Sequence, residues 1–107
     1  MDILEYNGTD FNAVLDFEHW RIGIINYGER FSVYTQEERH LLTDEAFVLL
    51  QGNAVLYEEG KAQDMEYGKV YNIRKGVWHH VVLQKDSKVL VVENSNTAKE
   101  NTERRYI

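Results

Sequence analysis

The sequence predicts an all-β protein that folds as a small antiparallel β-barrel, and three observations lead to this prediction. Short runs rich in Val, Ile, Tyr and Phe recur along the 107 residues, and strands favour these residue types. Turn-forming residues follow the runs at intervals of roughly eight to twelve residues, the rhythm of a sandwich or a small barrel. The few segments compatible with a helix are short or polar on every side.

Strands are predicted wherever such a run is followed by a turn. Two turns predict hairpins, one at Gly52-Asn53 and one at Lys85-Asp86-Ser87-Lys88, because small and polar residues between apolar runs favour tight reversals. The predicted strands are Trp20–Asn26, Phe31–Thr35, Ala46–Leu50, Ala54–Glu58, Val70–Arg74, His80–Leu83 and Lys88–Glu93.

Three segments do not fit this strand pattern. Residues 1–18 are predicted to form an N-terminal arm, in which Thr9–Leu15 allows one short helical turn. The polar segment Thr35–Asp44 is predicted to be a loop, and loops on rigid β scaffolds often carry functional residues. Residues 95–107 form a polar tail, and Asn96–Arg104 within it is a frayed helix at most. We therefore expect one domain over residues 1–107.

Composition excludes several classes of function. The net charge of −6 and the pI of about 5.1 disfavour nucleic-acid binding, since an acidic surface repels phosphate backbones. Basic helices of the kind that bind membranes are absent, and no apolar run approaches the ~20 residues that span a bilayer. The acidic N-terminal sequence lacks the features of a signal peptide, so the cytoplasm is the expected location. Without cysteine, any metal must be held by nitrogen and oxygen ligands.

Two clusters of residues have the spacing of a known pair of motifs. In the first, His40 is followed after four residues by Glu45 and after six more by Gly52; in the second, Gly68 precedes His79 with Arg74-Lys75-Gly76 between them. These clusters resemble the cupin motifs G-x5-H-x-H-x3–4-E-x6-G and G-x5-P-x-G-x2-H-x3-N. The resemblance implies a double-stranded β-helix of the jelly-roll type.

The sequence also departs from these motifs. Glu38 stands where the first motif has its first His, Ser32 replaces the opening Gly, Arg74 replaces Pro, and Leu83 replaces the final Asn. The resemblance implies that two His, a Glu and a third His bind one divalent metal.

Three of these four ligand positions are kept in this chain, as His40, Glu45 and His79. Glu38 is a candidate oxygen ligand at the fourth position. Imidazole and carboxylate together suit Zn, Fe, Mn, Ni or Co.

Each of these residues also has a purely structural interpretation. The barrel can keep the motif and bind no metal, with Glu45 as a loop carboxylate and His79 as a hydrogen-bonded interior residue. Glu38 is then a solvated member of the charged run that surrounds it. Since adjacent strand residues face opposite ways, His80 is expected on the exterior or in a subunit contact if His79 faces inward.

The candidate pocket residues are Phe47, Tyr71, Trp78 and Arg74. The aromatic residues among them are equally consistent with ordinary core and edge packing. Arg21 or Arg74 would bind an anionic substrate through a bidentate contact, or form a surface salt bridge.

Two functions remain open at this point. The first is a metal-dependent isomerase, lyase or dioxygenase that acts on a sugar, sugar acid or keto acid, with Glu45 or Glu38 as base when it is not a metal ligand. The second is a non-enzymatic small-molecule sensor with a degenerate metal site. A purely structural dimer module is a third interpretation, and a homodimer is expected in every case because exposed edge strands need covering.

Overall fold

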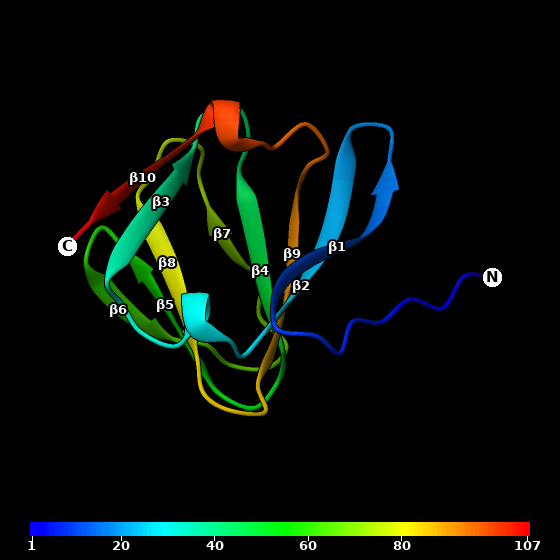
Figure 1. Cartoon of the computed structure of the whole chain (residues 1–107), viewed down its shortest axis with the longest axis horizontal. Coiled ribbons are helices and arrows are strands. Elements are labelled where there is room, and N and C mark those ends of the chain that lie inside the picture. Colours follow the sequence, from blue (N-terminus) through cyan, green and yellow to red (C-terminus); the bar gives the residue numbers. More distant parts are fainter.

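The structure is a computed structural model that describes every residue from Met1 to Ile107. It confirms the prediction of an all-β barrel: two antiparallel sheets of five strands each roll around one interior (Figure 1). One sheet has the strand order β1-β2-β9-β4-β7 and the other has the order β10-β3-β8-β5-β6. The strands are β1 Asp10–Phe17, β2 Trp20–Asn26, β3 Gln36–His40, β4 Glu45–Gln51, β5 Ala54–Glu58, β6 Lys61–Asp64, β7 Tyr71–Ile73, β8 His79–Leu83, β9 Lys88–Asn94 and β10 Thr102–Tyr106, with short 3-10 helices η1 Glu29–Phe31 and η2 Lys99–Asn101.

The chain passes repeatedly from one sheet to the other. Strands β3, β4 and β5 follow one another in sequence, yet β4 lies in a different sheet from β3 and β5. The predicted hairpins at Gly52-Asn53 and Lys85–Lys88 are therefore wrong, because each of these turns links strands of different sheets. The two corners pack together instead, since the backbone N–H of Asn53 donates to Ser87 Oγ at 2.8 Å. Gly52 is needed there, with a φ of +75° and no room for a side chain beside Ser87.

The core lies between the two sheets and follows the two-residue period of the strands. On β4, Phe47 and Leu49 point inward together with Glu45, and on β9 Val89 and Val91 do the same. The predicted face that Glu45 shares with Phe47 and Leu49 is thus observed. Because Glu45 is the first residue of β4, this inward-facing carboxyl group lies at one end of the barrel.

Five further segments differ from the sequence prediction. Thr9–Leu15 forms no helical turn, because its residues belong to β1 and pair with β2. The predicted strand Phe31–Thr35 is instead the end of η1 and a connecting loop, while β3 lies inside the predicted loop Thr35–Asp44. The polar tail contains η2 and the strand β10, and β6 was not predicted. The missed strands β3, β6 and β10 are polar, so they lack the apolar alternation by which strands are found. No helix of the protein is long and apolar enough to cross a membrane.

Strand β10 is joined to β3 by an ion pair between the buried Glu37 and the exposed Arg105. The guanidinium of Arg105 donates to Glu37 Oε1 through Nε at 3.0 Å and Nη2 at 2.8 Å, and Tyr34 Oη donates to Glu37 Oε2 at 2.7 Å. Glu37 is 1% exposed. Burial alone would raise the pKa of Glu37, but the hydrogen bonds from Tyr34 and Arg105 outweigh it and lower that pKa below its ordinary value of 4.5. These bonds explain how a charged β3 is buried.

We predict that Glu37→Gln destabilises the protein by about 2 kcal/mol, because it weakens a buried, charge-assisted contact. Glu103→Gln is the matched control. It also breaks a glutamate–arginine pair between β10 and β3, here with Arg39, but at the surface, where such pairs contribute only about 0.5 kcal/mol. Urea unfolding at neutral pH measures both, and equal losses would contradict the prediction.

The contribution of Glu37 also depends on pH in a defined direction. Since the pKa of Glu37 is lower in the folded protein than its ordinary 4.5, its stabilisation is present above pH 4.5 and is lost as the pH falls through the folded value. The difference in unfolding free energy between the wild type and Glu37→Gln should therefore shrink on acidification and disappear below the folded pKa.

Candidate functional site

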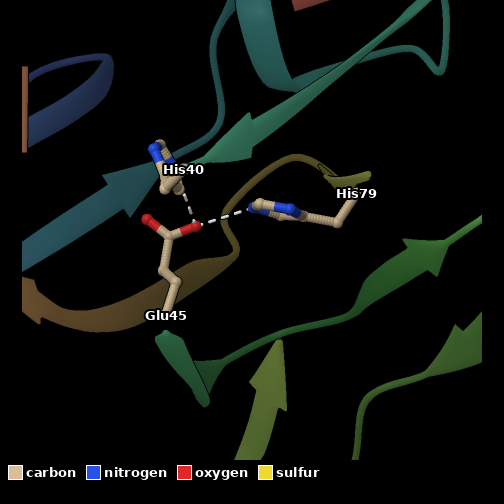
Figure 2. A group of neighbouring side chains, drawn as sticks. All are labelled: His40, Glu45 and His79. Atoms are coloured by element: carbon tan, nitrogen blue, oxygen red, sulfur yellow. Dashed lines mark hydrogen bonds and ion pairs between the residues drawn. The ribbon is translucent and has the colours of Figure 1, made fainter. Parts of the chain in front are cut away.

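Three buried side chains from three strands meet at one end of the barrel. Glu45 opens β4, His79 opens β8 and His40 ends β3. Glu45 Oε1 lies 2.7 Å from His79 Nε2 and 3.2 Å from His40 Nε2, and Figure 2 shows the carboxylate between the two rings. One potential ligand atom from each residue lies within 4.8 Å of the others. The geometry therefore gathers two nitrogens and one carboxylate oxygen around a single point.

In each imidazole, the nitrogen Nδ1, which faces away from Glu45, lies within hydrogen-bonding distance of a neighbouring oxygen. His79 Nδ1 lies 3.0 Å from the carbonyl oxygen of Val77. Because a carbonyl oxygen only accepts, Nδ1 carries the hydrogen and donates it. His40 Nδ1 lies 3.0 Å from Thr102 Oγ1, a hydroxyl supplied by β10. Outer partners of this kind orient histidine rings and direct Nε2 toward the site.

Electrostatics tie the two residues Glu45 and His79 into an ion pair. Burial acts to raise the pKa of Glu45, but hydrogen bonds from His40 and His79 outweigh it and hold that pKa well below the ordinary range. Burial likewise acts to lower the pKa of His79, and the hydrogen bond and negative charge of Glu45 reverse this and raise it. The raised pKa of His79 and the lowered pKa of Glu45 both favour a carboxylate paired with an imidazolium.

A second carboxyl group, Glu93 on β9, lies next to Glu45. Burial, followed by the hydrogen bond and charge of Glu45, raises the pKa of Glu93 to about 8. At neutral pH Glu93 is therefore protonated and donates to Glu45. Arg21 Nε donates to Glu93 Oε2 at 2.7 Å and opposes this rise.

The three-residue group lines a cavity of about 430 Å³. Phe47 and Val81 form part of its apolar wall. The C-terminal segment also contributes, since η2 and the residues on both sides of it lie along the cavity. The full lining is Phe11, Arg21, Ile25, Arg30, Phe31, Glu38, His40, Glu45, Phe47, His79, Val81, Glu93, Thr97, Ala98, Lys99, Thr102 and Arg104. A volume of this size accommodates a small metabolite.

Glu38 and His80 form a second buried pair, which corrects two of the structural interpretations. Glu38 is 4% exposed and His80 is fully buried, so Glu38 is not part of a solvated face and His80 is not on the exterior. His80 Nδ1 lies 2.8 Å from Glu38 Oε1, and the His80 ring stacks on Phe31. His80 is covered because η1 packs over it, a contact between segments far apart in the sequence. Glu38 lines the cavity but stands outside the group formed by His40, Glu45 and His79.

Three of the predicted pocket residues lie outside the cavity, and Phe47 alone lines it. The hydroxyl of Tyr71 accepts a hydrogen bond from the backbone of Glu66 at 2.9 Å. Trp78 packs on the other side of β8, under the guanidinium groups of Arg39 and Arg105. Arg74 is exposed in the turn before β8. Trp78 immediately precedes the inward-facing His79, so strand alternation directs it away from the interior.

Sequence reasoning missed the contribution of the last strand. Thr102 and Arg104 both line the cavity, and they are two residues apart on β10. Alternation within Thr102–Tyr106 is the only signal that points to them, and the polar composition of the tail conceals it. Arg30 was missed because it lies in the connection between two predicted strands, Trp20–Asn26 and Phe31–Thr35.

Comparison of sequences identifies no relative: no family model matches the chain, and no curated protein matches it. Comparison of structures finds solved proteins with a similar fold. The chain is similar to Pac13 from Streptomyces, determined with uridine, with a TM-score of 0.73 at 9% identity over 95% of this chain and 84% of that one. Pac13, which is represented by a second similar structure, is described as a β-barrel and a nucleoside dehydratase.

Two further solved structures extend the likeness. KdgF from Halomonas sp. has a TM-score of 0.69 at 18% identity, covering 84% of this chain and 81% of that one. A cupin-2 domain protein from Shewanella frigidimarina has a TM-score of 0.65 at 18% identity, covering 83% and 84%. At these identities the comparison defines the fold. The protein has the cupin fold, as the two motifs predict.

The Glu38–His80 pair gives a test of the buried site. We predict that His80→Leu costs about 3 kcal/mol of stability, because it leaves the Glu38 carboxylate buried without its partner. Adding Glu38→Met should recover most of the loss, since an apolar pair of similar volume replaces a buried hydrogen-bonded pair at little cost. Urea unfolding of the two single variants and the double variant measures this coupling. Losses that simply add would contradict it.

Proposed function

We propose that the protein binds a divalent metal through His40, Glu45 and His79, and that it acts on a small polar metabolite in the adjoining cavity. The observation that carries this proposal is the convergence of the three buried donor atoms on one point of the cavity wall. Two imidazoles and one carboxylate are a set that binds first-row transition metals and leaves positions open for water or substrate.

The hydrogen bonds of the site fit such a metal. His79 donates through Nδ1 to Val77, so in the neutral ring Nε2 has only a lone pair. That lone pair faces Glu45 Oε1 at 2.7 Å, which also only accepts. Two acceptors at this distance require a cation between them. A proton fills this role in the metal-free protein, and a metal ion that takes its place would satisfy the same atoms.

The chemistry that best suits the residues around this point is proton transfer. When bound, a metal would polarise a carbonyl or hydroxyl group of the metabolite. Glu38 is suited to act as the base, because it lines the cavity and His80 holds Oε1, while Oε2 is buried and has no hydrogen-bond partner. A carboxylate that removes and returns a proton supports isomerisation or elimination, so we favour an isomerase or lyase over a dioxygenase.

The size of the cavity restricts the metabolite. A volume of about 430 Å³ lies toward the lower end of small-molecule sites, which suits a sugar, a sugar acid or a keto acid. The likeness to Pac13, determined with uridine, supports a small polar ligand for this fold as well.

A non-enzymatic sensor is the second candidate function, and one observation favours it. Glu38 occupies the position where the first cupin motif has a histidine, and its Oε1 is engaged by His80. The metal would then have three protein ligands. A site with three protein ligands is expected to bind its metal less tightly than a site with four. A lower metal affinity is consistent with a protein that binds a metabolite and does not convert it.

We also propose that the protein forms a homodimer. The N-terminal arm extends away from the barrel (Figure 1) and exposes Met1 and Ile3. Phe17 at the end of β1 and Trp20 at the start of β2 are exposed as well. Apolar side chains in this arrangement are suited to burial against a second copy.

The metal assignment predicts that His79→Ala and Glu45→Ala abolish metal uptake, because each removes one of three ligands. Elemental analysis of protein purified without chelators, followed by titration with Zn²⁺, Mn²⁺ and Ni²⁺, measures this. His19→Ala is the control, since His19 is exposed and lies outside the cavity, and it should retain the metal. Wild-type protein that takes up none of these ions would overturn the proposal.

A thermal-shift screen of sugars, sugar acids and keto acids, with and without EDTA, separates the enzyme from the sensor. For a metal-dependent enzyme, we expect a stabilising metabolite that is consumed by metal-loaded protein and not by EDTA-treated protein. Glu38→Gln should suppress turnover and keep the metal. Stabilisation that persists in EDTA without turnover would favour the sensor.

A further inference from the structure

The cavity carries more positive side chains than its acidic residues neutralise. Its lining includes four Arg or Lys residues, namely Arg21, Arg30, Lys99 and Arg104, and three Glu residues, namely Glu38, Glu45 and Glu93. Two of these glutamates are already engaged: Glu93 contacts Arg21, and Glu45 contacts the two histidines. Lys99 and Arg104 form no ion pair with any carboxylate of the chain. This excess of positive charge is local, because the whole chain has a net charge of −6.

The Arg30 guanidinium is oriented by its neighbours, but one of its N–H donors has no hydrogen-bond acceptor. Its guanidinium lies over the ring of Phe31, 4.8 Å from the ring centroid, and this contact orients it. Its one ion pair, with Glu38, is long at 3.8 Å, and Glu38 already has a closer partner in His80. The Nε of Arg30 is buried and has no hydrogen-bond partner. A buried N–H without an acceptor is costly, and an acceptor on a bound ligand would remove that cost.

Arg104 approaches the same place from β10. It lies directly opposite Glu38 in the register between β10 and β3, so Glu38 is flanked by Arg104 on one side and by Arg30 on the other. Burial lowers the pKa of Arg30, and the positive charge of Arg104 lowers it further despite the opposing effect of Glu38. The two guanidinium groups line one cavity and repel each other, and an anion bound by both would relieve the repulsion.

We infer that Arg30 and Arg104, assisted by Lys99, form a subsite for an oxyanion carried by the metabolite, either a carboxylate or a phosphate ester. Guanidinium groups bind both through paired N–H donors. The inference deepens the proposed function, because it assigns the charge of the metabolite that shares the cavity with the metal. It also gives the C-terminal segment a role in selecting the ligand, since Lys99 and Arg104 both belong to it.

The test uses two simple anions as probes, sodium acetate for a carboxylate and inorganic phosphate for a phosphate ester. Each is titrated into metal-free, ¹⁵N-labelled protein at constant ionic strength, and the Nε–H signal of Arg30 is followed by NMR. We expect a saturable shift with at least one anion, and the anion that binds more tightly identifies the group. The double variant R30Q/R104Q should bind roughly tenfold more weakly or not at all, as expected from the loss of charged hydrogen bonds.

Arg74→Gln is the matched control, because Arg74 is an exposed arginine outside the cavity, and it should bind as the wild type does. Since the signal of Arg30 is lost in the double variant, backbone amides of Lys99 and Thr102 report binding in all proteins. No saturable shift in the wild type, or equal binding in R30Q/R104Q, would overturn the inference.

A second arm separates this subsite from the metal. The titration is repeated with zinc-loaded wild type, zinc-loaded R30Q/R104Q and the variant His79→Ala. Binding that survives in R30Q/R104Q but is lost in His79→Ala places the anion on the metal and contradicts the arginine subsite. Binding that survives in His79→Ala and is lost in R30Q/R104Q supports it. Metal uptake by R30Q/R104Q is measured separately, so a failure of the metal site is not mistaken for a failure of the anion site.

Discussion

Every carboxylate that this fold buries has to find a cation or a proton, and that constraint shapes the molecule. Glu37, Glu38, Glu45 and Glu93 are all buried in a small barrel. Their partners are Arg105, His80, the pair of His79 and His40, and Arg21. Most of these contacts join segments far apart in the sequence. An unpaired buried charge costs several kcal/mol. These pairs therefore stabilise the packing of the strands that surround the cavity.

The C-terminal strand shows how structure and site depend on one interaction. The Arg105–Glu37 contact attaches β10 to β3 from the outer face, while alternation directs Thr102 and Arg104 toward the cavity. Thr102 then contacts the ring of His40, and Arg104 adds positive charge beside Glu38. A strand that contributes little to the apolar core thereby completes the wall of the site and orients one of its three central residues.

The departures from the cupin motifs have physical explanations in three of four cases. Glu38 replaces a histidine and is compensated by His80, which packs against η1. Leu83 replaces an asparagine and is buried in the core. Arg74 replaces a proline in an exposed turn, where Gly76, with a φ of +82°, makes the reversal. Nothing in the structure explains Ser32 in place of the opening glycine.

The sequence by itself determined the all-β class, the cupin motifs and the three residues that converge, because strand alternation and motif spacing are local properties. Apolar strands such as β4 and β9 were predicted for the same reason. Only the tertiary structure decided that polar β3 and β10 pair, that His80 is buried, and that Arg30 and Arg104 share one cavity. Those outcomes depend on charged partners distant in the chain, which periodicity within one segment cannot reveal.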